Sequence, residues 1–353
     1  MVAAMARTAD SRRGDGVPTQ RRRGVPQRVG AKSPGKEIDV VAVGNAIVDV
    51  LAPTPDEVIS DQGLVKGTMR LVEADEAERL YAAMGPGTEM SGGAAANTAV
   101  GVALLGGSAH FVGKVADDQL GKVFTHDIRA VGVGFDVPPA PHGSTGRCLV
   151  MVSPDAQRTM STSLGVAGDL APKDLDEDLL RSASWVFLEG YFWDPPAARD
   201  SLIASAQVAS AVAFSLSDPL LVGRHHQDLW DFCDAYVDLL FGNEDEVLAL
   251  GQTDDLAEAI AKVRSLCETL VVTCSEKGSV VASSDGDVEV PAAPAQVVDT
   301  TGAGDLYAAG FLVGRCRGLD ARQCAELGGQ AAAAVIAQIG ARPDPSKPPF
   351  SRQ

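Results

Sequence analysis

The segment at residues 298–305, Val-Asp-Thr-Thr-Gly-Ala-Gly-Asp, constrains the fold more than any other part of this chain. It runs directly into an apolar stretch of helical length at 306–313. The small residues Gly302, Ala303 and Gly304 allow backbone N–H groups to converge without obstruction by side chains. The first N–H groups of a helix have no intrahelical partner and bind anions readily. The segment therefore predicts an anion site at a helix N-terminus.

Asp305 follows this predicted anion site directly. A carboxylate there repels a phosphate, unless it takes a proton from the group that attacks the phosphate. We therefore predict that Asp305 is a general base in phosphoryl transfer. The alternative is structural: Asp299 and Thr300 would form an ordinary N-cap, and Asp305 would favour the positive end of the helix dipole.

The rest of the chain has the pattern of an α/β protein. Its 353 residues, 45% of them hydrophobic, suit one large domain with an appendage or two modest domains. Short apolar runs that alternate with helical segments predict buried parallel strands; they lie at 38–44, 184–188, 212–218, 237–243 and 269–274. Residues 51–72 contain Pro and Gly at 53, 55, 63 and 67, so we expect short strands and loops there, as part of a small lid.

The charge distribution separates a tail from the body. The net charge is −17, which argues against a nucleic-acid or anionic-membrane surface on the body. Residues 1–36 instead carry nine basic and two acidic residues, with much Gly and Pro, and we predict a disordered basic tail. An Arg-rich leader could also be a transit peptide. No apolar run is long enough to cross a membrane, and six cysteines without a C-x-x-C spacing fit a reducing cytoplasm.

Two polar segments predict the acceptor side of the site. Asn45 and Asp49 follow the first strand, where open α/β sheets bind ligands. Gly92 and Gly93 precede an Ala-rich helix, so a substrate can lie against the backbone there, and Asn97 offers a donor and an acceptor. A solvated turn at Asp49 and a tightly packed helix start at 92–97 are the alternatives.

These blocks, in this order, resemble the ribokinase-like (PfkB) family of sugar and nucleoside kinases over about residues 38–350. The opening block comprises the glycine pair, Asn97 and Val-Gly-x-Val-x-Asp-x-x-x-Gly at 112–121, and the closing block is Asp-Thr-Thr-Gly-Ala-Gly-Asp at 299–305. Within the family, 44–49 and 340–350 are most similar to adenosine kinases. The resemblance implies a doubly wound, mainly parallel sheet flanked by helices in a kinase domain at 37–353, with a β-rich lid from about 48–72 and 143–165.

The resemblance also implies ATP, Mg²⁺ and a monovalent cation, with K⁺ the candidate. The Asn243-x-x-Glu246 pair is similar to the motif that holds Mg²⁺ through water, although an acidic first helical turn is the alternative. The residues implied at the nucleotide, besides Asn243 and Glu246, are Thr273, Ser275, Glu276, Gly278 and Ala332. Those implied at the monovalent cation are Asp299, Thr301, Val335 and Gly340.

The function implied is ATP-dependent phosphorylation of the 5′ hydroxyl of a nucleoside, adenosine first. Asn45, Asp49, Gly92, Gly93 and Asn97 would bind the ribose, Met69 and Phe192 the base, and Arg158 the transferred phosphate. Core packing is the alternative for at least two of the aromatic residues at 191–193, and an ordinary surface hairpin is the alternative for Arg158. A ribose or fructose kinase is one alternative, because the ribose-binding residues do not require a base. A non-catalytic nucleoside sensor is another, although binding alone does not need a general base. A monomer and a homodimer both remain open.

Overall fold

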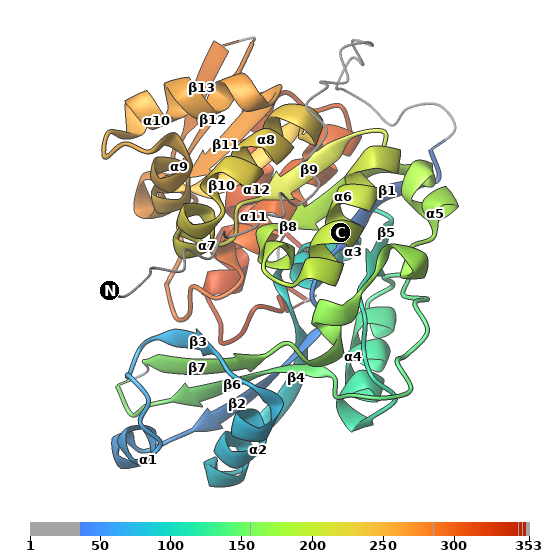
Figure 1. The fold of residues 1–353 in the computed structure, drawn as a ribbon. Coiled ribbons are helices and arrows are strands. Elements are labelled where there is room, and N and C mark those ends of the chain that lie inside the picture. Colours follow the sequence, from blue (N-terminus) through green and yellow to red (C-terminus); the bar gives the residue numbers. More distant parts are fainter. Residues whose placement is uncertain (1–35, 156, 285, 345, 348, 351–353) are drawn as a thin grey trace, which may run out of the picture.

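The computed structural model describes residues 36–155, 157–284, 286–344, 346–347 and 349–350. The predicted basic tail, apart from Lys36, lies outside the described residues. Within them, the strands form one eight-stranded and one five-stranded sheet. Figure 1 shows these sheets as two separate layers, with the small sheet below the large one.

The large sheet is mainly parallel. Its strands are, in spatial order, β13 (Gly286–Val290), β12 (Ser279–Ser283), β11 (Thr269–Thr273), β10 (Leu239–Asn243), β9 (Val212–Ser215), β8 (Ala183–Glu189), β1 (Ile38–Val43) and β5 (Ala109–Val112). Only the hairpin of β12 and β13 adds antiparallel pairs at one edge. The inner strands are mainly apolar because helices cover both faces of the sheet, and most of their polar residues lie at or near the strand ends. The predicted doubly wound sheet is confirmed.

Two groups of helices cover the two faces of the large sheet. One face packs against α3 (Ala94–Leu104), α4 (Gln119–Ala130), α11 (Ala303–Cys316) and α12 (Ala321–Ile336). The other packs against α5 (Glu177–Ser182), α6 (Pro196–Val208), α7 (Pro219–Arg224), α8 (His226–Tyr236), α9 (Glu244–Gly251) and α10 (Leu256–Val263). Short 3₁₀ turns lie at 165–169, 172–174, 190–193, 264–266 and 275–277. Each helix group buries its own hydrophobic cluster against the sheet.

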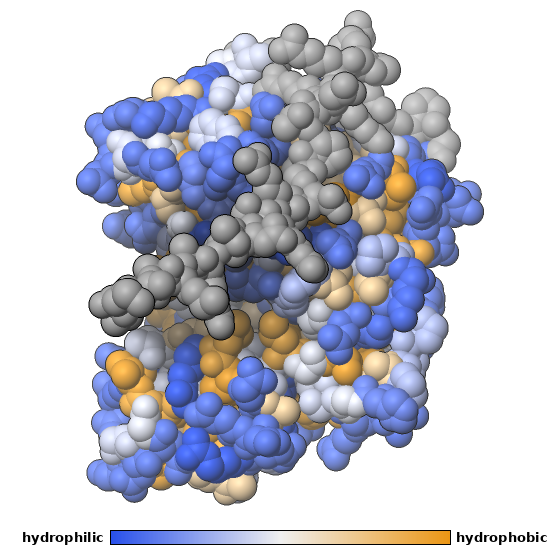
Figure 2. Space-filling view, in the orientation of Figure 1, coloured by the Kyte–Doolittle hydropathy of each residue, from blue (hydrophilic) through white to orange (hydrophobic). Residues whose placement is uncertain are grey.

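The small sheet has two different faces. Its strands are, in spatial order, β3 (Met69–Leu71), β7 (Arg158–Ser163), β6 (Gly146–Val152), β2 (Ile47–Pro53) and β4 (Thr88–Gly92). The helices α1 (Asp56–Asp61) and α2 (Ala74–Ala83) bury one face in a cluster around Ile59, Leu80 and Leu149. Figure 2 shows apolar side chains on the part of this layer that is turned toward the large sheet.

The expectation that residues 51–72 contain no helix was wrong. Pro55 is the N-cap of α1, where it costs no hydrogen bond, and the first turn carries Asp56 and Glu57. The buried side chain of Ile59 attaches this six-residue helix to the small sheet. Proline therefore starts a helix here, although we expected it to prevent one.

The parallel strands bring several predicted residues to one edge of the large sheet. The β1 strand ends just before Asn45, β8 ends at Glu189, and β10 ends at Asn243. Thr273, at the end of β11, is the sheet partner of Asn243. The helix α11, which carries Asp305 in its first turn, packs against α3 and begins at this same edge.

The contact between α11 and α12 depends on a close backbone approach at Gly310. A Cβ atom at this position would lie 2.7 Å from Gly328 Cα and 2.7 Å from Leu327 O. These are backbone atoms of a buried helix, so they cannot move aside without separating the two helices.

We therefore predict that Gly310→Ala lowers the free energy of unfolding by about 1–3 kcal/mol, as overpacking of a core does. Urea denaturation of both proteins measures this change. Gly223→Ala in α7 is the matched control, because a Cβ there meets nothing within 4 Å and should stabilise the helix by roughly 0.5–1 kcal/mol. Equal stability of Gly310→Ala and the parent would contradict the close approach.

Candidate active site

The predicted anion turn begins α11 as expected. Gly302 is its N-cap with φ +80°, and a Cβ there would lie 2.9 Å from Ala341 Cα. A side chain is therefore excluded both by the backbone conformation and by the neighbouring chain. Gly304 borders open space, so its backbone is accessible to a ligand. The N–H of Ala303 differs from the expectation, because it donates to Thr300 O at 3.2 Å within the turn.

Asp305 lies where the N-termini of α3 and α11 meet. Asn97 Nδ2 donates to Asp305 Oδ2 at 2.8 Å, and Thr98 Oγ1 donates to the backbone carbonyl of Asp305 at 3.2 Å. Burial raises the pKa of Asp305 to about 6, although the hydrogen bond from Asn97 and the charge of Arg342 both lower it. A carboxylate with this pKa is ionised at neutral pH and still basic enough to accept a proton.

The turn at Gly92 and Gly93, which we call the acceptor turn, brings the small sheet against the start of α3. Gly93 has φ +93°, and a Cβ there would collide with the carbonyl oxygen of Asn45. A Cβ at Gly92 would likewise collide with the carboxylate of Asp49. The glycine pair therefore allows β4 and α3 to approach both predicted ligand-binding residues. Burial raises the pKa of Asp49 to about 7, against the lowering charges of Arg342 and Arg158.

Glu189 is a residue of this site that our sequence reasoning missed. Its carboxylate accepts hydrogen bonds from the backbone N and the Nδ2 of Asn45, at 2.8 and 2.6 Å, and from Ala95 N at 2.7 Å. Burial raises its pKa to about 7. Glu189 thus fixes Asn45 relative to α3. Its place at the carboxyl end of a buried strand was a usable signal, because the same argument identified Asp49.

Three buried polar atoms near Asp49 and Asp305 have no hydrogen-bond partner among the described residues. They are Asn45 Oδ1, Asn97 Oδ1 and Arg342 Nη2. Because buried polar groups are nearly always paired, these three atoms are candidates for contacts with a ligand. Two acceptors and one donor, beside the Asp49 carboxylate, fit a ligand with several hydroxyl groups.

Arg158 connects the small sheet to the anion turn. Its Nη2 lies 2.5 Å from Asp299 Oδ2, and its Nη1 donates to Thr301 Oγ1 at 3.2 Å. Asp299 also accepts hydrogen bonds from Thr301 and from Gly340 N. A guanidinium therefore already supplies the positive charge that the resemblance assigned to a monovalent cation. The carbonyl of Val335 accepts an N–H at the end of α12 and keeps a second lone pair, so K⁺ at Asp299, Thr301, Val335 and Gly340 remains a prediction.

The residues predicted at Mg²⁺ form a capping box at the start of α9. Glu246 accepts hydrogen bonds from Asn243 N and Nδ2 at 3.0 and 2.8 Å, while Glu246 N donates back to Asn243 Oδ1. The side chain is 6% exposed, and burial raises its pKa to about 7. Each carboxylate oxygen retains a lone pair for a water molecule, so the pair fits a hydrated Mg²⁺. Within the described residues, no cluster of three or more His, Cys, Asp or Glu could hold a metal ion directly.

The predicted nucleotide turn follows β11 at the same sheet edge. Ser275 has φ +50°, Glu276 continues the 3₁₀ turn, and Gly278 ends it with φ +101°. Ala332 on α12 packs against the core cluster of that face. Because the turn follows Thr273, it lies next to the sheet pair that Thr273 forms with Asn243. Its role in nucleotide binding remains a prediction.

The two residues predicted at the base differ in exposure. Met69 on β3 is 41% exposed and pairs with Met160 of β7. Phe192 is 0% exposed and lies in the core cluster on the α6–α10 face, so it cannot contact a base in this arrangement. Its neighbour Trp193 is buried against Phe232. The prediction for Phe192 was wrong because its 3₁₀ turn directs the side chain under the sheet.

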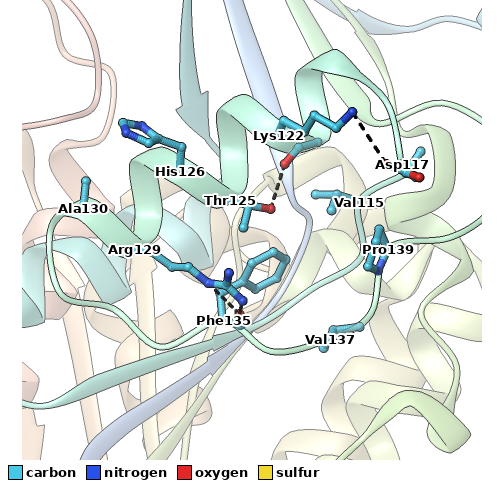
Figure 3. Close-up of a pocket in the computed structure, with 12 residues that line it drawn as sticks. Val115, Asp117, Lys122, Thr125, His126, Arg129, Ala130, Phe135, Val137 and Pro139 are labelled. Atoms are coloured by element: carbon cyan, nitrogen blue, oxygen red, sulfur yellow. Dashed lines mark hydrogen bonds and ion pairs between the residues drawn. The ribbon is translucent and has the colours of Figure 1, made fainter.

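A hollow of about 680 Å³ lies away from these residues, between α4 and the loop that follows it. Figure 3 shows Lys122, His126 and Arg129 of α4 along this hollow, with Phe135, Val137 and Pro139 opposite. Arg129 donates to Phe135 O, and Lys122 pairs with Asp117. None of the predicted site residues lines it.

No helix among the described residues has the length and apolarity to span a membrane.

Comparison with known proteins gives consistent matches. Residues 68–348 match the model of the pfkB family carbohydrate kinases. The adenosine kinase from Sinorhizobium meliloti is 46% identical, with a TM-score of 0.82 over 87% of this chain and 96% of that one. A probable sugar kinase from Rhizobium etli CFN 42 is 42% identical, with a TM-score of 0.83 and the same two coverages, 87% and 96%. A fructokinase from Klebsiella pneumoniae is 30% identical over 63% of this chain and 76% of its own length.

The matched region contains the anion turn, Asp305, Asn97 and the Asn243–Glu246 capping box. Asn45 and Asp49 precede it but lie within the two-sheet fold that the solved structures share. Sequence match, fold and site geometry thus agree, and the chain belongs to the pfkB family of carbohydrate kinases, whose members are phosphotransferases with a hydroxyl group as acceptor.

Proposed function

We propose that the protein transfers the γ-phosphoryl group of ATP to the 5′ hydroxyl of a nucleoside, with adenosine as the leading substrate. The observation that carries this proposal is the position of Asp305, 2.8 Å from Asn97 of the acceptor turn and one residue after the open Gly304. A carboxylate between a ligand-binding turn and an anion site suits proton removal from an attacking hydroxyl. The 46% identity to an adenosine kinase supports the choice of adenosine.

The reaction needs one proton transfer and one displacement. The acceptor hydroxyl gives its proton to Asp305 while its oxygen bonds to the γ-phosphorus, and the bond from that phosphorus to the bridging oxygen breaks to release ADP. Backbone N–H groups at Gly302 and Gly304 stabilise the charge on the transferring group, a contribution of about 3 kcal/mol for each well-placed donor. Asn243 and Glu246 would hold Mg²⁺ through water, and the ion would supply positive charge for the phosphates.

The acceptor is oriented by the polar atoms without protein partners. Asn45 Oδ1, Asn97 Oδ1 and the Asp49 carboxylate accept hydrogen bonds from ribose hydroxyls. Arg158, which reaches the anion turn from the small sheet, approaches the transferred phosphate when the small sheet closes as a lid over the substrate. The cytoplasm remains our proposed compartment, because six cysteines without a C-x-x-C spacing fit a reducing environment.

A sugar kinase is the second candidate function. The hydroxyl-binding atoms would serve ribose or fructose equally well, and relatives at 42% and 30% identity are a probable sugar kinase and a fructokinase. The apolar side chains Met69 and Leu71 favour the nucleoside, because they are exposed on β3 at 41% and 54%. A nucleobase would cover such side chains, whereas a free sugar would leave them in water.

Asp305→Asn tests the general base. We predict that kcat falls by about 10²- to 10⁴-fold while adenosine still binds, because the amide keeps the shape but cannot take a proton. Steady-state kinetics and calorimetric binding measure the two effects. Turnover within about threefold of the parent would rule out Asp305 as the base.

The pKa of Asp305 predicts the acid limb of the pH profile. Since burial raises this pKa to about 6, kcat/KM for the acceptor should fall as the pH drops through about 6 and the base becomes protonated. Asn97→Ala removes a hydrogen bond that lowers the pKa, so the midpoint should move to higher pH. An unchanged midpoint in this variant would show that the acid limb of the pH profile does not report the ionisation of Asp305.

Adenosine and ribose distinguish the two candidate functions. If the lid encloses a base, kcat/KM for adenosine should exceed that for ribose by at least about 10³, which is roughly 4 kcal/mol of transition-state binding. Steady-state kinetics with both acceptors and fixed ATP give the ratio. Comparable values, or faster ribose, would overturn the nucleoside assignment and favour the sugar kinase.

A further inference from the structure

The C-terminal segment 340–342 lies between the two halves of the proposed site. On the phosphate side, Gly340 N donates to Asp299 Oδ2 at 2.6 Å, and Ala341 packs against the anion turn at Gly302. On the acceptor side, the side chain of Arg342 reaches the start of α3. Three consecutive residues therefore connect the anion turn to the acceptor turn, although about 200 positions separate these turns in the chain.

Arg342 holds the acceptor turn from both ends. Its Nε donates to Ser91 O at 2.8 Å, and its Nη1 donates to Ala96 O at 3.1 Å. These carbonyls flank Gly92 and Gly93, which are the residues that approach Asn45 and Asp49. A planar guanidinium can bind two carbonyls in fixed directions at once, so it sets the shape of the turn between them.

The charge of Arg342 also acts on both carboxylates, where it opposes the increase in pKa that burial causes at Asp49 and Asp305. It faces Asp49 of β2, Asp305 of α11 and Asp127 of α4. The further titratable or charged groups that act on Asp49 or Asp305 are Cys148 of β6, Arg158 of β7, Glu189 of β8, Tyr191 of the turn at 190–193 and Glu246 of α9. Two carboxylates in one buried site disfavour each other's ionised form unless a cation offsets them. The Nη2 atom of Arg342 is buried without a partner among the described residues, which leaves one donor for a ligand.

We propose that Arg342 is a positioning residue of phosphoryl transfer: it fixes the acceptor turn through Ser91 and Ala96 and supplies a positive charge that favours the ionised forms of Asp49 and Asp305. This role rests on the proposed functions of these two carboxylates. Arginine suits the task because it stays protonated at neutral pH, even though burial lowers the pKa of Arg342 to about 10. Lysine would keep the charge, but its single ammonium group cannot reproduce the two fixed contacts.

Arg342→Met and Arg342→Lys separate the two parts of the role. For the Met variant we expect kcat/KM for the acceptor to fall at least about tenfold, and the acid limb to move up by about half a pH unit or more, because loss of a neighbouring cation raises a carboxyl pKa. For the Lys variant we expect a similar fall in kcat/KM with the limb at its parental pH. The KM for ATP should stay within about twofold of the parent in both variants.

Arg317→Met is the matched control. Arg317 donates to Leu105 O at the opposite end of α3, so its loss removes an arginine contact to the same helix away from the site. This variant should keep the parental acid limb and acceptor kcat/KM. Thermal melting of all variants, with and without ATP, identifies any loss of the folded state.

Several outcomes would overturn the proposal. The proposal is wrong if Arg342→Met keeps the parental acid limb and the parental kcat/KM for the acceptor. It is also wrong if Arg342→Met changes these two quantities no more than Arg317→Met does. If the Met variant does not fold, the Lys variant decides, and parental acceptor kinetics would then refute the positioning role. A failure of the proposed function is distinguishable, because the parental protein itself would then phosphorylate neither adenosine nor the sugars.

Discussion

The site depends on one contact, the hydrogen bond from Asn97 to Asp305, where the N-termini of α3 and α11 meet. The contact exists because α3 and α11 pack side by side on the same face of the large sheet. Each helix begins after a glycine whose positive φ turns the chain sharply, Gly93 for α3 and Gly302 for α11. The acceptor turn and the anion turn therefore face each other, with the carboxylate between them.

This arrangement concentrates buried negative charge. Burial raises the pKa of Asp49, Glu189 and Asp305 to between about 6 and 7, because it disfavours their ionised forms. The protein offsets the cost with specific donors and charges: Asn45 and Ala95 for Glu189, Asn97 for Asp305, and the guanidinium of Arg342 for Asp49 and Asp305. Such a site is electrostatically prepared for a ligand that brings hydroxyl donors, as a sugar or a nucleoside does.

Local patterns predicted the elements whose structure depends on local chemistry. Short apolar runs between glycines or acidic residues identified β1, β8, β10 and β11, because strands buried on both faces must be apolar throughout. The helix α1 was missed because a proline can begin a helix as well as prevent one. Phe192 was misplaced because an aromatic residue at a strand end can turn either to the cleft or to the core, and only the packing around Leu216 and Phe214 selects the core.

The amino-acid sequence by itself determined the family and the mainly parallel sheet, and it predicted the turn at 302–304 and the carboxylate that follows it, because each was recognised from short local patterns and their order along the chain. Only the tertiary structure decided which distant residues meet. It brings Glu189 into hydrogen-bonding contact with Asn45 and pairs Arg158 with Asp299. It also directs the side chain of Arg342 to the carbonyls of Ser91 and Ala96. The physical reason is that a buried charge acquires its partners from packing between elements, and no local pattern around Arg342 records that Ser91, 251 residues away, will accept its hydrogen bond.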